Sequence, residues 1–152
     1  MRDRFIKFMA TGLGTGLVPV APGTAGSVLG VGYWWLLCNL RNEFLYYGIA
    51  LTGVVFAIWC AGAAAKLYRQ EDPSCVVIDE IVAIPLVLAG VPAVWWAVAL
   101  GFVFFRLFDV WKPFPVRQSQ ALPGGVGIVV DDVLAALYAC GLTHAVVWLV
   151  TR

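Results

Sequence analysis

Residues 81–108 read IVAIPLVLAGVPAVWWAVALGFVFFRLF, an apolar run whose middle is broken by Gly90-Val91-Pro92. A continuous helix over this run would be about 42 Å long at 1.5 Å per residue, and it would separate Glu80 from Asp109 by the thickness of a membrane. Glycine close to proline is a common place for a chain to turn. If the chain folds back there, Glu80, Arg106 and Asp109 lie at the same end, where their opposite charges attract in a medium of low dielectric constant. We therefore predict a helical hairpin around Gly90–Pro92.

The composition places the whole chain among membrane proteins. Hydrophobic residues make up 62% of 152 positions, charged residues only 12%, and the mean hydropathy is +0.89. Three more apolar stretches accompany the hairpin, at roughly 25–40, 44–65 and 133–151. A helix needs about 20 residues to cross a bilayer, so the second and third fit single spans, whereas the sequence does not settle whether 25–40 spans. We predict an all-α integral membrane bundle, one domain over 1–152, with about four to five membrane-embedded helices.

The N-terminus and the basic residues predict an orientation. Residues 1–10 mix three cations with Phe5, Ile6, Phe8 and Met9, a pattern that indicates a short helix lying in the headgroup layer. Under the hairpin arrangement most basic residues fall on one side, which the positive-inside rule makes cytoplasmic. The residues on that side are Arg2, Arg4, Lys7, Lys66, Arg69, Lys112 and Arg117, and only Arg41 and Arg152 fall outside it.

Other classes of protein are disfavoured. A net charge of +1 and the absence of a long basic run argue against nucleic-acid binding. The four cysteines are scattered without a Cys-x-x-Cys pair or a histidine cluster, which argues against a disulfide framework and a zinc site. The sequence leaves the oligomeric state open, and a homo-oligomer is compatible with it.

Acidic residues beside apolar segments are the strongest functional signal. An ionised carboxylate there costs several kcal/mol unless it is compensated, so such charges usually mark functional sites. The acids singled out by this criterion include the adjacent pairs Asp79-Glu80 and Asp131-Asp132. They also include Asp109, which lies three residues after Arg106 and three residues before Lys112. Purely structural roles compete with this interpretation: salt bridges that hold the bundle together, an interfacial helix with snorkelling cations, and helix capping by Asp131 or Asp132. Taken together, the three acidic sites resemble a divalent-cation site with the oxygen ligands that Mg²⁺ prefers.

Two glycine-rich segments flank these charges. The first, residues 11–27, precedes an apolar helix, where glycines and a free helix N-terminus could hold a phosphate group. The alternative is that its glycines only allow helices to pack closely. The second, residues 123–130, leads into the last acidic pair. Asp72, just before Pro73, is a candidate cap for the helix that carries Asp79 and Glu80.

Motifs for covalent catalysis are missing. The chain has no Cys-x5-Arg loop, no Asp-x-Asp pair, and no histidine among the charged residues, since the single histidine, His144, lies in the last apolar stretch. A covalent phosphoenzyme is therefore disfavoured, which leaves attack by a metal-activated water molecule.

Four motifs in this order resemble the phosphatidylglycerophosphatase A family. They are Thr-Gly-x-Gly-x-Gly-x-x-Pro-x-x-Pro-Gly-Thr-x-Gly-Ser, Val-Ile-Asp-Glu, Phe-Arg-x-Phe-Asp-x-x-Lys-Pro-x-Pro and Gly-Gly-x-Gly-x-x-x-Asp-Asp. The similarity covers about residues 8–140, nearly the whole chain. The resemblance implies an all-helical, Mg²⁺-dependent membrane phosphatase that converts phosphatidylglycerophosphate to phosphatidylglycerol and phosphate. It also implies the cytoplasmic (inner) membrane of a bacterium, with several membrane passes and an active site facing the cytoplasm.

The resulting hypothesis assigns two groups of residues. The metal-binding and catalytic group is Asp79, Glu80, Asp109, Asp131 and Asp132, and the phosphate-binding group is Arg106, Lys112, Thr11, Gly14, Thr15, Gly23 and Thr24. Glu80 or Asp79 is the residue we expect to orient water. Two alternatives remain: a small transporter whose acids form an ion pathway, and a scaffold subunit whose charges join helices.

Overall fold

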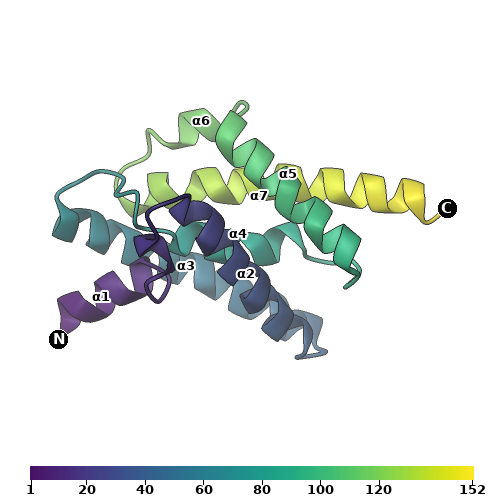
Figure 1. Ribbon diagram of the computed structural model, residues 1–152, viewed down its shortest axis with the longest axis horizontal. Helices are drawn as coiled ribbons and strands as arrows, with labels where there is room; N and C mark the ends of the chain where they lie inside the picture. The colour runs from purple at the N-terminus through teal and green to yellow at the C-terminus, as the bar shows by residue number, and fades with distance from the viewer.

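The computed structural model describes all residues, 1–152, and confirms an all-helical fold. Seven α-helices and one 3-10 turn make up the chain, and no strand is present. In chain order they are α1 (Arg2–Ala10), η1 (Thr15–Leu17), α2 (Pro22–Cys38), α3 (Glu43–Tyr68), α4 (Ile78–Val87), α5 (Trp95–Trp111), α6 (Val116–Ser119) and α7 (Gly125–Val150). Figure 1 shows α3 and α7 as the long helices, with the other helices packed along and across them.

The short helix α4 lies at the centre of the bundle. Seven of its ten residues are buried, and it packs against α2, α3, α5 and α7. Pro85 has no N–H group to donate within the helix, and the last carbonyl groups of α4 have no helical donor. In an apolar setting these carbonyl groups need hydrogen-bond donors from other side chains. Tyr46 donates a hydrogen bond to the Pro85 carbonyl (2.6 Å), and the Trp34 indole donates one to the Leu88 carbonyl (3.3 Å). These bonds fix α4 between α2 and α3.

The predicted hairpin around Gly90–Pro92 is confirmed. Helix α4 ends at Val87 and α5 begins at Trp95, with Gly90 at φ +71°, a left-handed conformation that favours glycine. The two arms are unequal, at about 15 and about 26 Å for 1.5 Å per residue. Their charged ends nevertheless meet, because α5 is inclined across the bundle (Figure 1).

Two helix starts differ from the sequence prediction. Helix α7 begins at Gly125 and not near residue 133, so Asp131 and Asp132 lie in its second turn and do not cap it. A Cβ atom at Gly125 would collide with the backbone of α3 at Ile58 and Gly62, which shows that this glycine permits close helix packing and does not form a loop. Asp72 is not the cap of α4 either. Helix α4 begins six residues later, because the Val77 N–H bonds to the Ala10 carbonyl (2.9 Å) and holds the preceding segment outside the helix.

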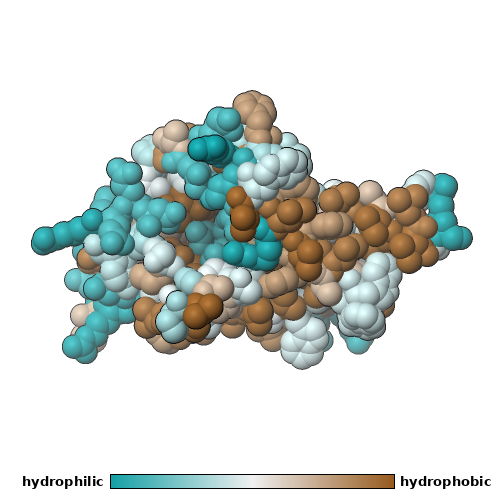
Figure 2. All heavy atoms as spheres, turned by 45° about the horizontal axis from the view of Figure 1, so that its top comes forward, coloured by the Kyte–Doolittle hydropathy of each residue, from teal (hydrophilic) through white to brown (hydrophobic).

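The surface agrees with a membrane protein. Helices α3 and α7 are long and apolar enough to cross a bilayer, and only 33% and 28% of their most apolar windows are buried, unlike the core helices of soluble proteins. Figure 2 shows hydrophobic side chains covering one half of the molecule and hydrophilic ones gathered at the other end. Helix α1, predicted from residues 1–10, packs on α3 through Ile6 and Ala10 and leaves Phe5 and Phe8 exposed.

Candidate functional site

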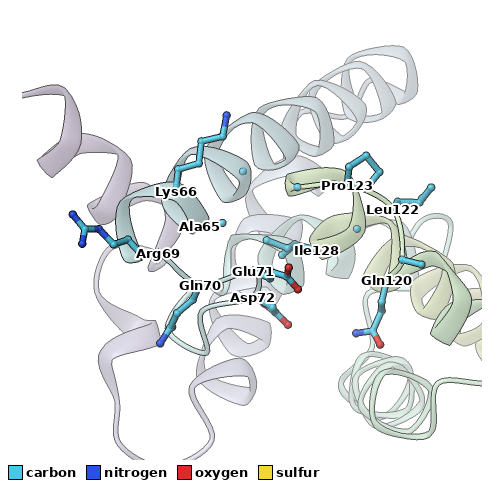
Figure 3. Close-up of a pocket in the computed structure, with 14 residues that line it drawn as sticks. Ala65, Lys66, Arg69, Gln70, Glu71, Asp72, Gln120, Leu122, Pro123 and Ile128 are labelled. Carbon is cyan, nitrogen blue, oxygen red and sulfur yellow. The ribbon is translucent and has the colours of Figure 1, made fainter.

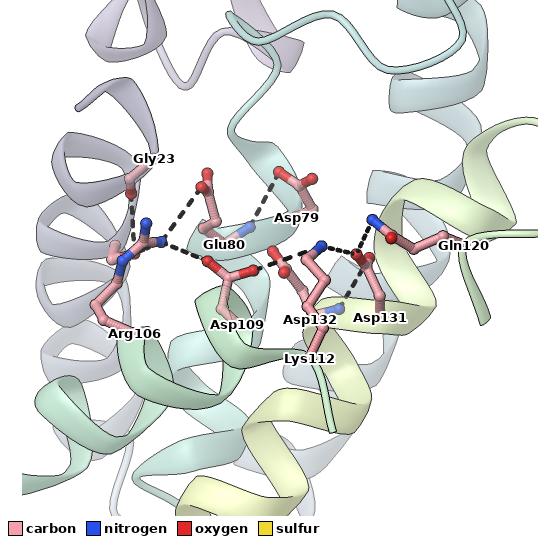
Figure 4. A network of polar contacts seen from close by, with 10 residues as sticks. Gly23, Asp79, Glu80, Arg106, Asp109, Lys112, Gln120, Asp131 and Asp132 are labelled. Carbon is pink, nitrogen blue, oxygen red and sulfur yellow. Dashed lines mark hydrogen bonds and ion pairs between the residues drawn. The ribbon is translucent and has the colours of Figure 1, made fainter. Parts of the chain in front are cut away.

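The sequence-predicted charged residues meet at one end of the bundle. Figure 4 shows them as one network: Asp79 and Glu80 come from the first turn of α4, Arg106 and Asp109 from the last turns of α5, Lys112 from the residue after α5, and Asp131 and Asp132 from the second turn of α7. Because α4 begins where α5 ends, the hairpin brings five of these residues together, and α7 supplies the other two. An ion pathway would need acids distributed across the membrane, whereas a site at one boundary needs this arrangement.

Arg106 connects three helices. One of its nitrogens, Nη1, lies 2.9 Å from Asp109 Oδ2, 3.5 Å from Glu80 Oε1 and 3.4 Å from the hydroxyl of Ser27 on α2. Ser27 is fully buried and donates its own hydrogen to the Gly23 carbonyl (2.9 Å), so it can accept the arginine proton. The other two guanidinium nitrogens, Nε and Nη2, have no partner in the protein and remain available to an anion.

Lys112 connects α5 to α7. Its Nζ lies 2.6 Å from Asp131 Oδ2 and 3.9 Å from Asp109 Oδ1, and Gln120 donates a second hydrogen bond to Asp131 Oδ2 (3.0 Å). Burial by itself lowers the pKa of Lys112, but the hydrogen bond and charge of Asp131 outweigh burial, and the pKa lies above its usual value. The lysine therefore stays charged at neutral pH.

The two acidic pairs share a local geometry. Asp79 Oδ1 accepts the Glu80 N–H (3.1 Å), and Asp131 Oδ1 accepts the Asp132 N–H (3.0 Å). The second member of each pair has an oxygen left over, since Glu80 Oε2 and Asp132 Oδ2 are buried without a hydrogen-bond partner. Asp132 is only 4% exposed. A buried carboxylate oxygen without a donor is costly unless a cation or a proton compensates its charge.

The first glycine-rich segment only partly joins the site. The N–H groups of residues 12–18 all donate to carbonyls within residues 8–15. The hydroxyls of Thr11 and Thr15 donate to the carbonyls of Phe8 and Gly12. The structure shows no hydrogen bond or ion pair between Thr11, Gly14 or Thr15 and the charged network. Gly23 and Thr24 differ, because they lie in the first turn of α2 and their N–H groups have no backbone acceptor. A Cβ atom at Gly23 would collide with Glu80 and come within 3.4 Å of Arg106, which places this backbone at the site.

Two residues of the network were not predicted from the sequence. Ser27 belongs to the first glycine-rich motif, but only the position of α2 against α5 reveals its contact with Arg106. Gln120 has no sequence signal, because it lies in the irregular segment between α6 and α7 and reaches Asp131 only through the fold.

A polar hollow adjoins the network at Gln120. Its volume is about 740 Å³, and it lies between the C-terminal end of α3, residues 69–72 and the segment before α7. In Figure 3 the carboxylates of Glu71 and Asp72 face the side of the hollow that carries Gln120, while Lys66 and Arg69 point away from it. Gln120 is the one residue of the network that lines this hollow.

The arrangement also limits what can bind without movement. No three of the acids lie close enough to one another to hold one metal ion in this structure. Lys112 lies between Asp109 and Asp131 and occupies part of the space that the acids surround (Figure 4). The donor set itself, five carboxylates with two orphaned oxygens, still suits a hard divalent cation.

The helical bundle gathers acidic and basic side chains at one end. This arrangement is typical of enzymes that act on phosphate esters at a membrane boundary. Comparison with known proteins agrees with that class. The model of the family Phosphatidylglycerophosphatase A matches residues 8–147. The chain is 34% identical to Phosphatidylglycerophosphatase A of Escherichia coli (strain K12), over 90% of this chain and 80% of that protein. It is 35% identical to the protein of the same name from Haemophilus influenzae, over 93% and 88% of the two chains.

The chain therefore belongs to the phosphatidylglycerophosphatase A family and is a phosphatase. Another relative carries a different name: "Putative phosphatidylinositol-3-phosphatase" of Bacteroides thetaiotaomicron is 38% identical over 98% of both chains. No solved structure matches the chain.

Proposed function

We propose that the protein removes the terminal phosphate of phosphatidylglycerophosphate to give phosphatidylglycerol, with Mg²⁺ as cofactor, at the cytoplasmic face of a bacterial inner membrane. The observation that carries the proposal is the meeting of five carboxylates and two cations at one end of a membrane bundle whose relatives include two proteins named for this activity. A phosphomonoester on a lipid head group is the substrate that such a boundary site can reach.

The cations and the start of α2 would bind the phosphoryl group. Arg106 offers Nε and Nη2 in a planar fork that matches phosphate oxygens, and Lys112 adds a point charge beside Asp109 and Asp131. The N–H groups of Gly23 and Thr24 lie at the positive end of the α2 dipole, next to Arg106. These donors come from different sides of the network, so they can surround a phosphate and orient it.

The acids fit a magnesium ion by their chemistry. Asp79, Glu80, Asp109, Asp131 and Asp132 would hold it, and the unpartnered oxygens of Glu80 and Asp132 support this role. When bound, a divalent ion lowers the pKa of a coordinated water molecule and neutralises charge on the phosphoryl group. Asp79 or Glu80 would orient the attacking water and accept its proton, since both lie in the first turn of α4 near Arg106.

The distribution of basic residues supports the orientation. Lys66 and Arg69 at the C-terminal end of α3, and Lys112 and Arg117 after α5, lie at the end of the bundle that carries the site. Arg41, between α2 and α3, and Arg152, after α7, lie at the opposite helix ends. By the positive-inside rule, this distribution favours the cytoplasmic side for the site of a multi-pass protein. Cysteine-accessibility labelling beside Asp79, Asp109 and Asp131 tests this placement, and labelling from opposite sides would favour the ion-pathway alternative.

The deciding experiment is phosphate release by purified protein in detergent or vesicles. Phosphatidylglycerophosphate, phosphatidylinositol 3-phosphate and phosphatidate are compared, with and without Mg²⁺. We expect the first lipid to give the highest kcat/KM and chelation to abolish turnover. A clear preference for phosphatidylinositol 3-phosphate would overturn the substrate assignment in favour of the activity for which the Bacteroides thetaiotaomicron relative is named.

A further inference from the structure

Lys112 lies inside the charged network, between acids of α5 and α7 (Figure 4). Its Nζ is 2.6 Å from Asp131 Oδ2 and 3.9 Å from Asp109 Oδ1, so one ammonium group compensates part of the negative charge of both carboxylates. A divalent cation shared by the same two acids would need the space that this ammonium group occupies. Lys112 and such an ion therefore compete for one place.

The oxygens of Asp131 already have donors. Oδ2 accepts hydrogen bonds from Lys112 Nζ and from Gln120 Nε2 (3.0 Å), and Oδ1 accepts the Asp132 N–H (3.0 Å). A carboxylate oxygen offers about two acceptor positions, so Oδ2 has none left while both donors stay in place. Asp131 Oδ2 becomes available to a metal ion when the ammonium group leaves.

Two other acids of the network lack a partner. Glu80 Oε2 and Asp132 Oδ2 are buried and accept no hydrogen bond, and Lys112 Nζ bonds to neither residue. In this structure, with Lys112 between Asp109 and Asp131, no three acids lie close enough to hold one metal ion. A lysine ammonium donates to few oxygens, whereas Mg²⁺ takes an octahedral set of ligands. Lys112 therefore compensates the acids only in part.

Lys112 is the movable member of its pair with Asp131. It follows the last residue of α5 and precedes Pro113, and its side chain is 26% exposed on a flexible four-carbon stem. Asp131 lies in the second turn of α7 and is 4% exposed, so the helix holds its carboxylate in place. The ammonium group can therefore turn away from Asp131 without a change in either helix.

We propose that Lys112 holds the place of the metal ion in the metal-free enzyme, and that Mg²⁺ binding releases its ammonium group from Asp131 to the phosphoryl group of the substrate. This inference rests on the proposed function and adds an order: the metal binds first, and the lysine becomes available to phosphate afterwards. Without the metal, the ion pair prevents repulsion among the acids. With the metal, the same cation binds the opposite charge of the substrate.

The first test measures Mg²⁺ binding without substrate, by isothermal titration calorimetry on purified protein in detergent. Lys112→Met is compared with wild type and with Arg117→Met, which removes an exposed cation five residues further on. A competing form that makes up about nine-tenths of the metal-free protein weakens the apparent affinity about tenfold. We therefore expect the Kd for Mg²⁺ to be about tenfold lower in Lys112→Met and within about twofold of wild type in Arg117→Met.

The second test follows the lysine itself in the wild-type protein. Lysine side chains are acetylated briefly with a water-soluble reagent, and the modification of Lys112 is measured by mass spectrometry relative to the exposed Lys66. The three conditions are chelator, Mg²⁺, and Mg²⁺ with inorganic phosphate. We expect Mg²⁺ to speed the modification of Lys112 by about tenfold, because the ion pair with Asp131 is broken, and added phosphate to slow it again.

The outcomes separate this inference from the proposed function. Unchanged modification of Lys112 on addition of Mg²⁺, or a Kd for Mg²⁺ in Lys112→Met equal to or above that of wild type, would overturn the exchange and leave the proposed function standing. Modification that rises with Mg²⁺ and does not fall with phosphate would overturn the transfer of the lysine to the phosphoryl group. No Mg²⁺ binding by the wild type, together with phosphate release that persists in chelator, would overturn the metal dependence of the proposed function itself.

Discussion

Lys112 and Asp131 form the shortest ion pair of the charged network, with 2.6 Å between Nζ and Oδ2. The lysine follows the last turn of α5 in a left-handed conformation (φ +48°), and the aspartate lies in the second turn of α7. The pair therefore joins the hairpin to the last helix at the site. Asp131 is 4% exposed, so its buried negative charge is compensated by the ion pair with Lys112 and the hydrogen bond from Gln120.

Replacement of Lys112 by methionine should damage both the site and its phosphate binding. We expect kcat/KM to fall by about 10- to 100-fold, because a buried carboxylate loses its cation and the phosphoryl group loses a charged donor. Lys112→Arg should recover part of this loss. The control is Arg117→Met, an exposed cation five residues further on. If Lys112→Met kept wild-type kinetics, the lysine would have no role in phosphate binding.

Asp79→Asn is the corresponding test of the acids. The substitution keeps the shape of the side chain and removes its charge, so the fold should persist while turnover falls by about 100-fold or more at saturating Mg²⁺. Asp3→Asn, at an exposed position of α1, serves as the control. Turnover of Asp79→Asn within a few-fold of wild type would remove this residue from any catalytic role.

Much of the fold follows from local sequence signals. The break at Gly90–Pro92 predicts the hairpin, because glycine and proline interrupt a helix by backbone geometry alone, and the apolar lengths predict the spans α3 and α7. The period of three that relates Arg106, Asp109 and Lys112 predicts their common face, as the two i,i+3 ion pairs of Asp109 show. These features are determined by residues close together in the sequence, so they can be predicted from the sequence alone.

What the sequence could not show depends on contacts between distant helices. Glycines signal either a loop or a close approach, and only the position of α3 shows that Gly125 is inside a helix. The glycine-rich pattern likewise predicted that residues 12–18 donate hydrogen bonds to a phosphate. Their N–H groups instead donate to carbonyl groups of residues 8–15. Gln120 lies between α6 and α7 and bonds to Asp131, eleven residues further on, so no local helical pattern could identify it.

Removal of the metal gives a test with two readouts. We expect chelation to abolish phosphate release and added Mg²⁺ to restore it. A ligand that binds only the folded protein raises the melting temperature, so Mg²⁺ should also stabilise the wild type measurably without substrate. Asp132→Asn should lose this stabilisation, because it removes the charge beside an unpartnered buried oxygen. Full activity in chelator would contradict the metal requirement.

Gly23→Ala tests how closely α2 must approach the site. The added Cβ atom would collide with the Glu80 carboxylate, which must therefore move, and it would lie 3.4 Å from Arg106 Nη1, an ordinary contact. The matched control is Gly32→Ala in the same helix, where a Cβ atom meets nothing within 4 Å and alanine should be neutral or slightly stabilising, by up to about 1 kcal/mol. We expect kcat/KM of Gly23→Ala to fall by about tenfold or more, since small displacements of catalytic groups are costly, while its melting temperature stays close to that of the control. Equal activity of the two variants would show that the α2 backbone at Gly23 does not shape the position of Glu80 or Arg106.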